Sequence, residues 1–230
     1  DNAIANIFNA AENGQRQGAI GLLNTHWGDN GSLEYEPIGY LGTACGAAAA
    51  WCLETARTLP LAAAVSLHAF GDPTGVIGQI AYDLGNAYRL FQTKTHNNNA
   101  PFLFIINDMY SNRWREPEVS EAELRQSIAY VQDTMSRWDQ AEPDHFYADL
   151  MREEFENNVA MWVHGCRAAL AIQQEARGEH PDWRALADEL QRIVSEHHRL
   201  WLIRNRPGGL SDSAARLGSR LPYYLSRLNG

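Results

Sequence analysis

The residues that follow the apolar run AIGLLNT, at positions 19–25, have the chemistry that sugar binding requires. Trp27 offers a flat apolar face to a sugar ring, and Asp29 can accept hydrogen bonds from neighbouring hydroxyl groups. His26 directly precedes the tryptophan and could line such a pocket or point away from it. A structural interpretation stays open beside the functional one: a packed tryptophan at the end of a strand, followed by an Asp-Asn-Gly turn.

Three more polar residues of the same loop are candidate contacts for a sugar: Asn30, Glu34 and Tyr35. Their amide, carboxylate and hydroxyl groups form hydrogen bonds of the kind that sugar hydroxyls offer. Together with His26, Trp27 and Asp29 they make up the predicted substrate-binding set.

Other titratable residues favour structural roles. Asp188-Glu189 is the only Asp-Glu dipeptide, and its place in the amphipathic stretch WRALADELQRIV predicts a solvated helix face. His197 and His198 are expected on the surface, because neighbours on a helix point about 100° apart and no third metal ligand is near. His164 is predicted to be a core histidine with satisfied hydrogen bonds. The sequence therefore predicts neither a metal site nor a cofactor.

Cysteine usage and charge bound the function further. Cys45 and Cys52 are seven residues apart on a predicted helix, about 10 Å of rise, which is too far for a disulfide. With Cys166 they are expected to be free thiols in a reducing compartment, which favours the cytoplasm. The formal net charge of −9 argues against nucleic acid as a partner. No apolar run approaches the roughly 20 residues that span a bilayer, and no signal peptide is visible.

The elements around these residues predict a mainly α chain. Residues 20–25 are expected to form a strand buried on both faces, and FLFII, at 102–106, is the other stretch that could be a strand. A strand needs neighbours for its backbone groups, so either it pairs with a partner or the chain is a piece of something larger. The predicted helices lie at 3–15, 40–52, 59–70, 73–92, 120–138, 144–177, 182–203 and 211–228.

This order of elements resembles a known family. A helix, a buried strand ending in Trp-Gly-Asp, a Pro-containing loop and an Ala-rich helix ending at Trp51 resemble the last α/β unit of a family 20 glycoside hydrolase. The similarity is to a divergent β-N-acetylhexosaminidase-like branch with a helical C-terminal domain. HWGDNGS and RNRPGGL carry it most distinctively, and FGDPTG and LGNAY are also similar. The resemblance implies that residues 1–55 form the terminal helix–strand–helix portion of a (β/α)8 barrel and that 56–230 form a helical domain.

The resemblance also implies roles for individual residues. Trp27 matches the wall of the pocket for the terminal sugar, and Asp29 matches the acid that binds its outer hydroxyls. Ser32 and Leu33 stand where the family has a His or an aromatic residue, so no contact is carried over to them. The family's adjacent Asp-Glu pair, which performs substrate-assisted hydrolysis, has no counterpart in this chain. No catalytic residue is therefore expected here, and the chain alone should be inactive.

The implied partners are an N-terminal barrel polypeptide or subunit and a carbohydrate substrate, and a homo-oligomer is possible. Two other interpretations stay open. One is a non-enzymatic helical module whose single strand adds to a partner's sheet. The other is a sugar-binding module that lacks a catalytic acid. The sequence leaves the sugar and its linkage undetermined.

Overall fold

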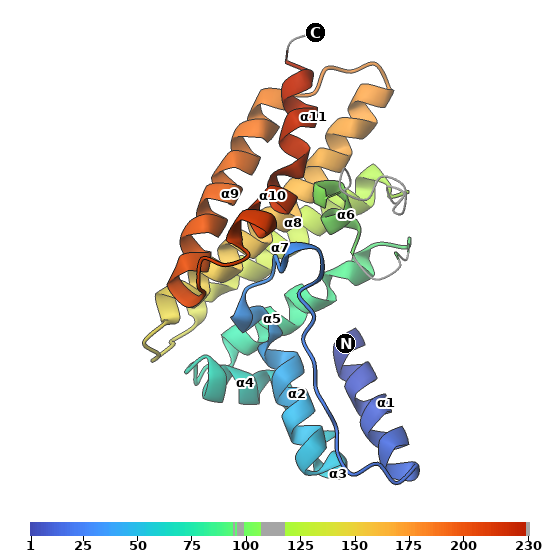
Figure 1. Cartoon of the computed structure of the whole chain (residues 1–230), viewed down its shortest axis with the longest axis vertical. Helices are drawn as coiled ribbons and strands as arrows, with labels where there is room; N and C mark the ends of the chain where they lie inside the picture. Colours follow the sequence, from blue (N-terminus) through green and yellow to red (C-terminus); the bar gives the residue numbers. More distant parts are fainter. Residues whose placement is uncertain (94, 96–98, 107–117, 229–230) are drawn as a thin grey trace. The chain divides into compact units, whose positions relative to one another are not determined.

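The computed structural model of the chain describes residues 1–93, 95, 99–106 and 118–228, which form helices and irregular segments with no strand (Figure 1). The mainly α prediction is confirmed. The α-helices are α1 (Asn2–Arg16), α2 (Tyr40–Trp51), α3 (Leu53–Ala56), α4 (Leu61–Ala69), α5 (Val76–Asn86), α6 (Ala100–Ile106), α7 (Glu121–Ser136), α8 (Ala148–Ala176), α9 (Trp183–Arg204), α10 (Leu210–Leu217) and α11 (Leu221–Ser226). The 3-10 turns are η1 (Asp29–Gly31), η2 (Glu36–Gly39), η3 (Ala87–Leu90), η5 (Arg137–Gln140) and η6 (Gly218–Arg220).

The chain divides into two compact units. The first unit contains residues 1–28, 34–86 and 134–152, and the second contains 29–33, 87–133 and 153–230. The predicted boundary at residue 55, between a barrel portion and a helical domain, stays a prediction.

The first unit is built on small residues that let helices approach closely. α1, α2 and α3 bury a cluster of Ala11, Ala49, Leu53 and Ala56. α4 and α5 are closer still, because a Cβ at Gly78 would lie 1.9 Å from the Ala62 carbonyl oxygen. The two helices are therefore in backbone contact, an approach that only glycine permits.

The predicted strand at 20–25 is not formed. Residues 19–28 run beside α2 without regular structure, and Ile20 and Leu23 are 108% and 86% exposed (Figure 1). Residues 20–27 make no backbone–backbone hydrogen bond to any residue that the structure describes. The physical reason is the one raised by the sequence: a strand cannot form where no second strand offers donors and acceptors.

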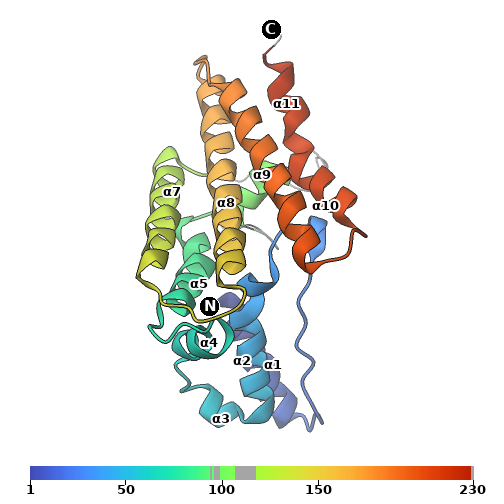
Figure 2. The same ribbon diagram turned by 90° about the vertical axis from the view of Figure 1, so that its left-hand side faces the viewer.

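The second unit is a set of long helices with short ones packed on them. α7, α8 and α9 run side by side, linked by hydrogen bonds such as Trp162 to Ser127 (2.8 Å) and His164 to Glu189 (2.9 Å) (Figure 2). α9 begins as predicted, where the Asp182 carboxylate accepts a hydrogen bond from the Ala185 amide at 2.9 Å.

The second candidate strand, at 102–106, is a helix. It lies in α6, which is buried in the second unit. Asn99 caps the helix by accepting a hydrogen bond from the Phe102 amide at 2.9 Å, and Pro101 occupies its first turn. A Cβ at Gly165 of α8 would lie 2.2 Å from the Pro101 carbonyl oxygen, so α6 packs directly on α8. The apolar run is continuous because nearly every side of this short helix is covered.

Candidate functional site

From Leu22 to Trp27 the side chains alternate between two sides although no sheet is present. Leu22 packs against the cluster formed by α1, α2 and α3. The Asn24 amide donates a hydrogen bond to the Gly42 carbonyl at 3.2 Å, and a Cβ at Gly46 would lie 2.3 Å from Asn24 Nδ2. Leu22 and Asn24 therefore rest on the small-residue face of α2, whereas Ile20 is fully exposed.

The odd-numbered residues of the segment face away from α2. Leu23 is 86% exposed and Trp27 is 75% exposed. The Trp27 indole N–H donates a hydrogen bond to the Thr25 hydroxyl at 3.1 Å, which places residues 25 and 27 on one side. A spacing of two residues is the period of a β-strand. The segment thus has the side-chain pattern of a strand without its hydrogen bonds.

His26 and Glu34 are the two predicted site residues that the structure brings together. The imidazole Nε2 of His26 contacts the Glu34 carboxylate, and its ring lies against Gly39, where a Cβ would be 3.0 Å away. Desolvation raises the pKa of Glu34, although the nearby imidazole acts in the opposite direction. Glu34 keeps 43% of its side chain exposed. The pair could exchange a proton with a bound molecule or hold a hydroxyl group.

The remaining predicted residues are placed differently. Tyr35 is 6% exposed and packs inside the first unit. It is therefore a core residue and does not lie at the rim of a sugar site. The backbone of Asp29 opens η1, but its side chain lies outside the part of the chain that the structure describes. Asn30 is partly exposed in the second unit, with a left-handed φ of 59°.

The predicted Asp-Asn-Gly turn is confirmed. Gly31 follows Asn30 with φ of 111° and Ser32 with φ of 52°, so three consecutive residues have positive φ. Such a conformation is costly for non-glycine residues, and asparagine tolerates it best. Within the second unit the turn lies against α10, since a Cβ at Gly31 would be 3.0 Å from Arg216 Cδ.

No family model, curated protein or solved structure matches the chain. The resemblance to a glycoside hydrolase is therefore untested by any comparison, and the binding roles of Trp27 and its neighbours stay predictions.

Two residues that were predicted to be solvated are not. Glu189 has 18% of its side chain exposed and bonds both to Arg167 and to the fully buried His164, so a wholly solvated helix face is wrong there. His197 is fully buried and bonds to the Ser213 hydroxyl at 2.8 Å, so its predicted surface position is also wrong. Both errors have one cause: partners 16 to 25 residues away convert an apparently exposed position into a packed one.

The prediction of a satisfied core histidine at 164 is confirmed. Its Nδ1 contacts Glu189 at 2.9 Å and its Nε2 lies 3.1 Å from the Tyr224 hydroxyl. His164 and Tyr224 are both fully buried, and with Glu189 they tie α8, α9 and α11 together.

No group of three or more His, Cys, Asp or Glu residues that could hold a metal ion occurs among residues 1–93, 95, 99–106 and 118–228. Within the same ranges, every helix is too short or too polar to cross a membrane. The cysteines that the structure describes are free thiols, as predicted.

Proposed function

We propose that residues 1–55 are the last helix–strand–helix portion of a (β/α)8 barrel in a glycoside hydrolase that acts on a terminal N-acetylhexosamine. Trp27 and Asp29 contribute to the sugar pocket, and the catalytic Asp-Glu pair belongs to an N-terminal barrel part outside these 230 residues. The reaction is the substrate-assisted, retaining one.

The observation that carries the proposal is the state of segment 20–27. From Leu22 to Trp27 its side chains alternate with a period of two, and Leu22 and Asn24 rest on the α2 side. The backbone groups of residues 20–27 make no backbone–backbone hydrogen bond to any described residue. In a (β/α)8 barrel each strand rests on its helices by one face, turns the other toward the barrel interior and pairs along both edges. The contact of Leu22 and Asn24 with the α2 side corresponds to the face that rests on the helices. The exposed Leu23 side chain and the backbone edges, unpaired among the described residues, are available for the barrel interior and for neighbouring strands.

The exposed side chains support the same proposal. Ile20, Leu23 and Trp27 expose large apolar side chains to water, which costs about 25 cal/mol for each Å² left uncovered. A barrel would bury the first two. Trp27, at the carboxyl end of the strand, would remain at the mouth, where barrel enzymes place their sites.

The test uses the protein as isolated from its natural source, with release of 4-nitrophenol from 4-nitrophenyl N-acetyl-β-D-glucosaminide as the readout. Trp27→Ala should lower kcat/KM at least tenfold, because stacking on the sugar ring is lost. Trp51→Ala is the matched control, since Trp51 is 92% exposed in the same unit and has no proposed contact with the sugar. Equal activity of the Trp27 variant and the control would reject the proposal.

A non-enzymatic function is the second candidate, because the same free edges could receive a strand from a partner's sheet. The upstream reading frame separates the two. A further 300 or so residues with barrel periodicity and an Asp-Glu pair favour the enzyme, in keeping with the size of such barrels. Binding of glycan without turnover would instead identify a sugar-binding module.

A further inference from the structure

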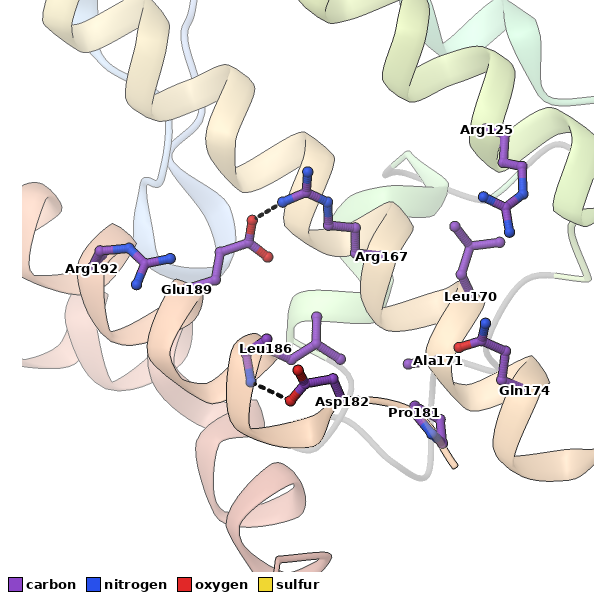
Figure 3. Close-up of a pocket in the computed structure, with 11 residues that line it drawn as sticks. Arg125, Arg167, Leu170, Ala171, Gln174, Pro181, Asp182, Leu186, Glu189 and Arg192 are labelled. Carbon is purple, nitrogen blue, oxygen red and sulfur yellow. Dashed lines mark hydrogen bonds and ion pairs between the residues drawn. The ribbon is translucent and has the colours of Figure 1, made fainter. Parts of the chain in front are cut away.

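A groove of about 390 Å³ lies in the second unit, where α7, α8 and α9 meet (Figure 3). It belongs to no site described above, and no predicted site residue lines it. Its floor is apolar: Leu170, Ala171 and Leu186 are 9%, 4% and 7% exposed. The groove is open to solvent along one side, and its size suits a small molecule.

Three arginines, each from a different helix, surround this floor: Arg125 of α7, Arg167 of α8 and Arg192 of α9 (Figure 3). Two carboxylates, Asp182 and Glu189, also line it. The sign of the charge that the groove favours therefore depends on which of these groups are already paired.

Both carboxylates are already engaged. Asp182 caps α9 through the Ala185 amide, at 2.9 Å. Glu189 divides its two oxygens between His164 and Arg167. Glu189 therefore has both oxygens bonded, whereas Asp182 uses Oδ1 in the cap and keeps Oδ2 for solvent. The lining carries three arginines against two carboxylates, so its charge balance is positive.

The arginines retain donors. Arg192 makes no hydrogen bond or ion pair with any described residue. Arg125 donates from Nε and Nη2 to Glu121, and its Nη1 makes no hydrogen bond to any described residue. Free guanidinium donors in a fixed planar fork match a carboxylate, which they can bind through two parallel hydrogen bonds.

We propose that this groove binds a small monocarboxylate with an apolar body. The apolar part lies on Leu170, Ala171 and Leu186, and the carboxylate is bound by Arg192 at the rim. The proposal does not depend on the proposed hydrolase activity, because the groove lies within the helical unit and shares no residue with the sugar site.

The test is a titration of the isotope-labelled chain with sodium octanoate, followed by NMR. We expect saturable shifts confined to amides around residues 167–174 and 182–192. Arg192→Gln should weaken binding about tenfold, since a charge-assisted hydrogen bond is lost. Arg184→Gln is the matched control, because Arg184 is an exposed arginine of the same helix that does not line the groove. Its affinity should stay within twofold of the unmodified chain.

A second variant tests the floor independently of charge. Ala185 lines the groove and is exposed, so Ala185→Leu should occupy the space without disturbing the core and should also weaken octanoate binding. Octan-1-ol is the neutral control ligand. The proposal is overturned if octan-1-ol binds as tightly as octanoate, if Arg184→Gln weakens binding as much as Arg192→Gln, or if millimolar octanoate produces no saturable shift.

Discussion

Segment 20–27 and the interface between α8 and α9 differ in which groups are buried and which are paired. At the interface, buried charges are paired: Glu154, at 1% side-chain exposure, bonds to Arg204 through both carboxylate oxygens. In the segment, apolar side chains face water and backbone groups lack partners among the described residues. These backbone groups are exposed and bond to water instead. The interface is therefore complete in itself, whereas the segment has the properties of a surface that another element covers.

The largest effect is expected from removing the buried ion pair of the α8–α9 interface. Arg204→Gln leaves the Glu154 carboxylate buried without its cation, which should lower the free energy of unfolding by about 3–5 kcal/mol. Arg199→Gln is the control, because Arg199 pairs with Glu153 and Glu196 at the exposed surface and should cost less than about 1 kcal/mol. Urea denaturation measures both. Similar losses in the two variants would contradict the contrast between buried and exposed pairs.

The buried histidine of α9 makes the second unit sensitive to acid. Burial lowers the pKa of His197 to about 4, with a smaller effect from His198, whereas the ordinary value is 6.5. As the pH falls below 6.5 the unfolded chain takes up the proton first, so stability is lost between pH 6.5 and 4. The loss approaches about 3 kcal/mol below pH 4. His197→Gln should remove this pH dependence, whereas His198→Gln, at an exposed position, should retain it. Denaturation midpoints across this pH range provide the measurement.

The three cysteine thiols should differ in their rates of alkylation, because they differ in burial. Hydrogen bonds from Thr55 lower the pKa of Cys52, whereas burial raises the pKa of Cys45 and raises that of Cys166 to about 12. The thiolate is the reactive form, so iodoacetamide at pH 7.5 should alkylate Cys52 first and Cys166 only after unfolding. Mass spectrometry of the digested protein gives the order. Early alkylation of Cys166 would show that α8 is less well packed than described.

The smallest effect is expected in the segment itself. Leu23→Ser in the isolated chain should change the free energy of unfolding by less than about 0.5 kcal/mol, because the side chain is 86% exposed. Leu190→Ala, at a fully buried position of α9, should cost about 2–5 kcal/mol. Thermal and urea unfolding of the two variants compare the regions directly. A large loss at Leu23 would mean that the segment is already covered.

Local signals in the sequence predicted the long helices well. Ser120 and Glu123 form the expected capping box, with the Ser120 amide 2.8 Å from a Glu123 oxygen. The possible strand at 102–106 is a helix, because a short apolar run does not distinguish a buried strand from a buried helix. The decisive signals, Asn99 and Pro101, are helix-start residues that lie just before that run.

The site was less predictable for a different reason. The turn after Trp27 follows from the preference of Asn and Gly for positive φ, a local property. Pairing of Glu189 with His164, and the meeting of Arg125, Arg167 and Arg192 around one groove, depend on how three helices pack. The spacing of residues within one helix does not predict contacts between residues of different helices. Whether segment 20–27 forms a strand depends on a partner, which a single sequence does not supply.

Hydrogen exchange of the segment tests the central claim most directly. Amides of residues 20–27 would be followed by mass spectrometry in the isolated chain and in the protein isolated from its natural source. If the segment is a barrel strand without its neighbours, its amides exchange rapidly in the isolated chain and become strongly protected in the natural protein. Rapid exchange in both would contradict the account, because the segment would then be an exposed loop that no sheet ever includes.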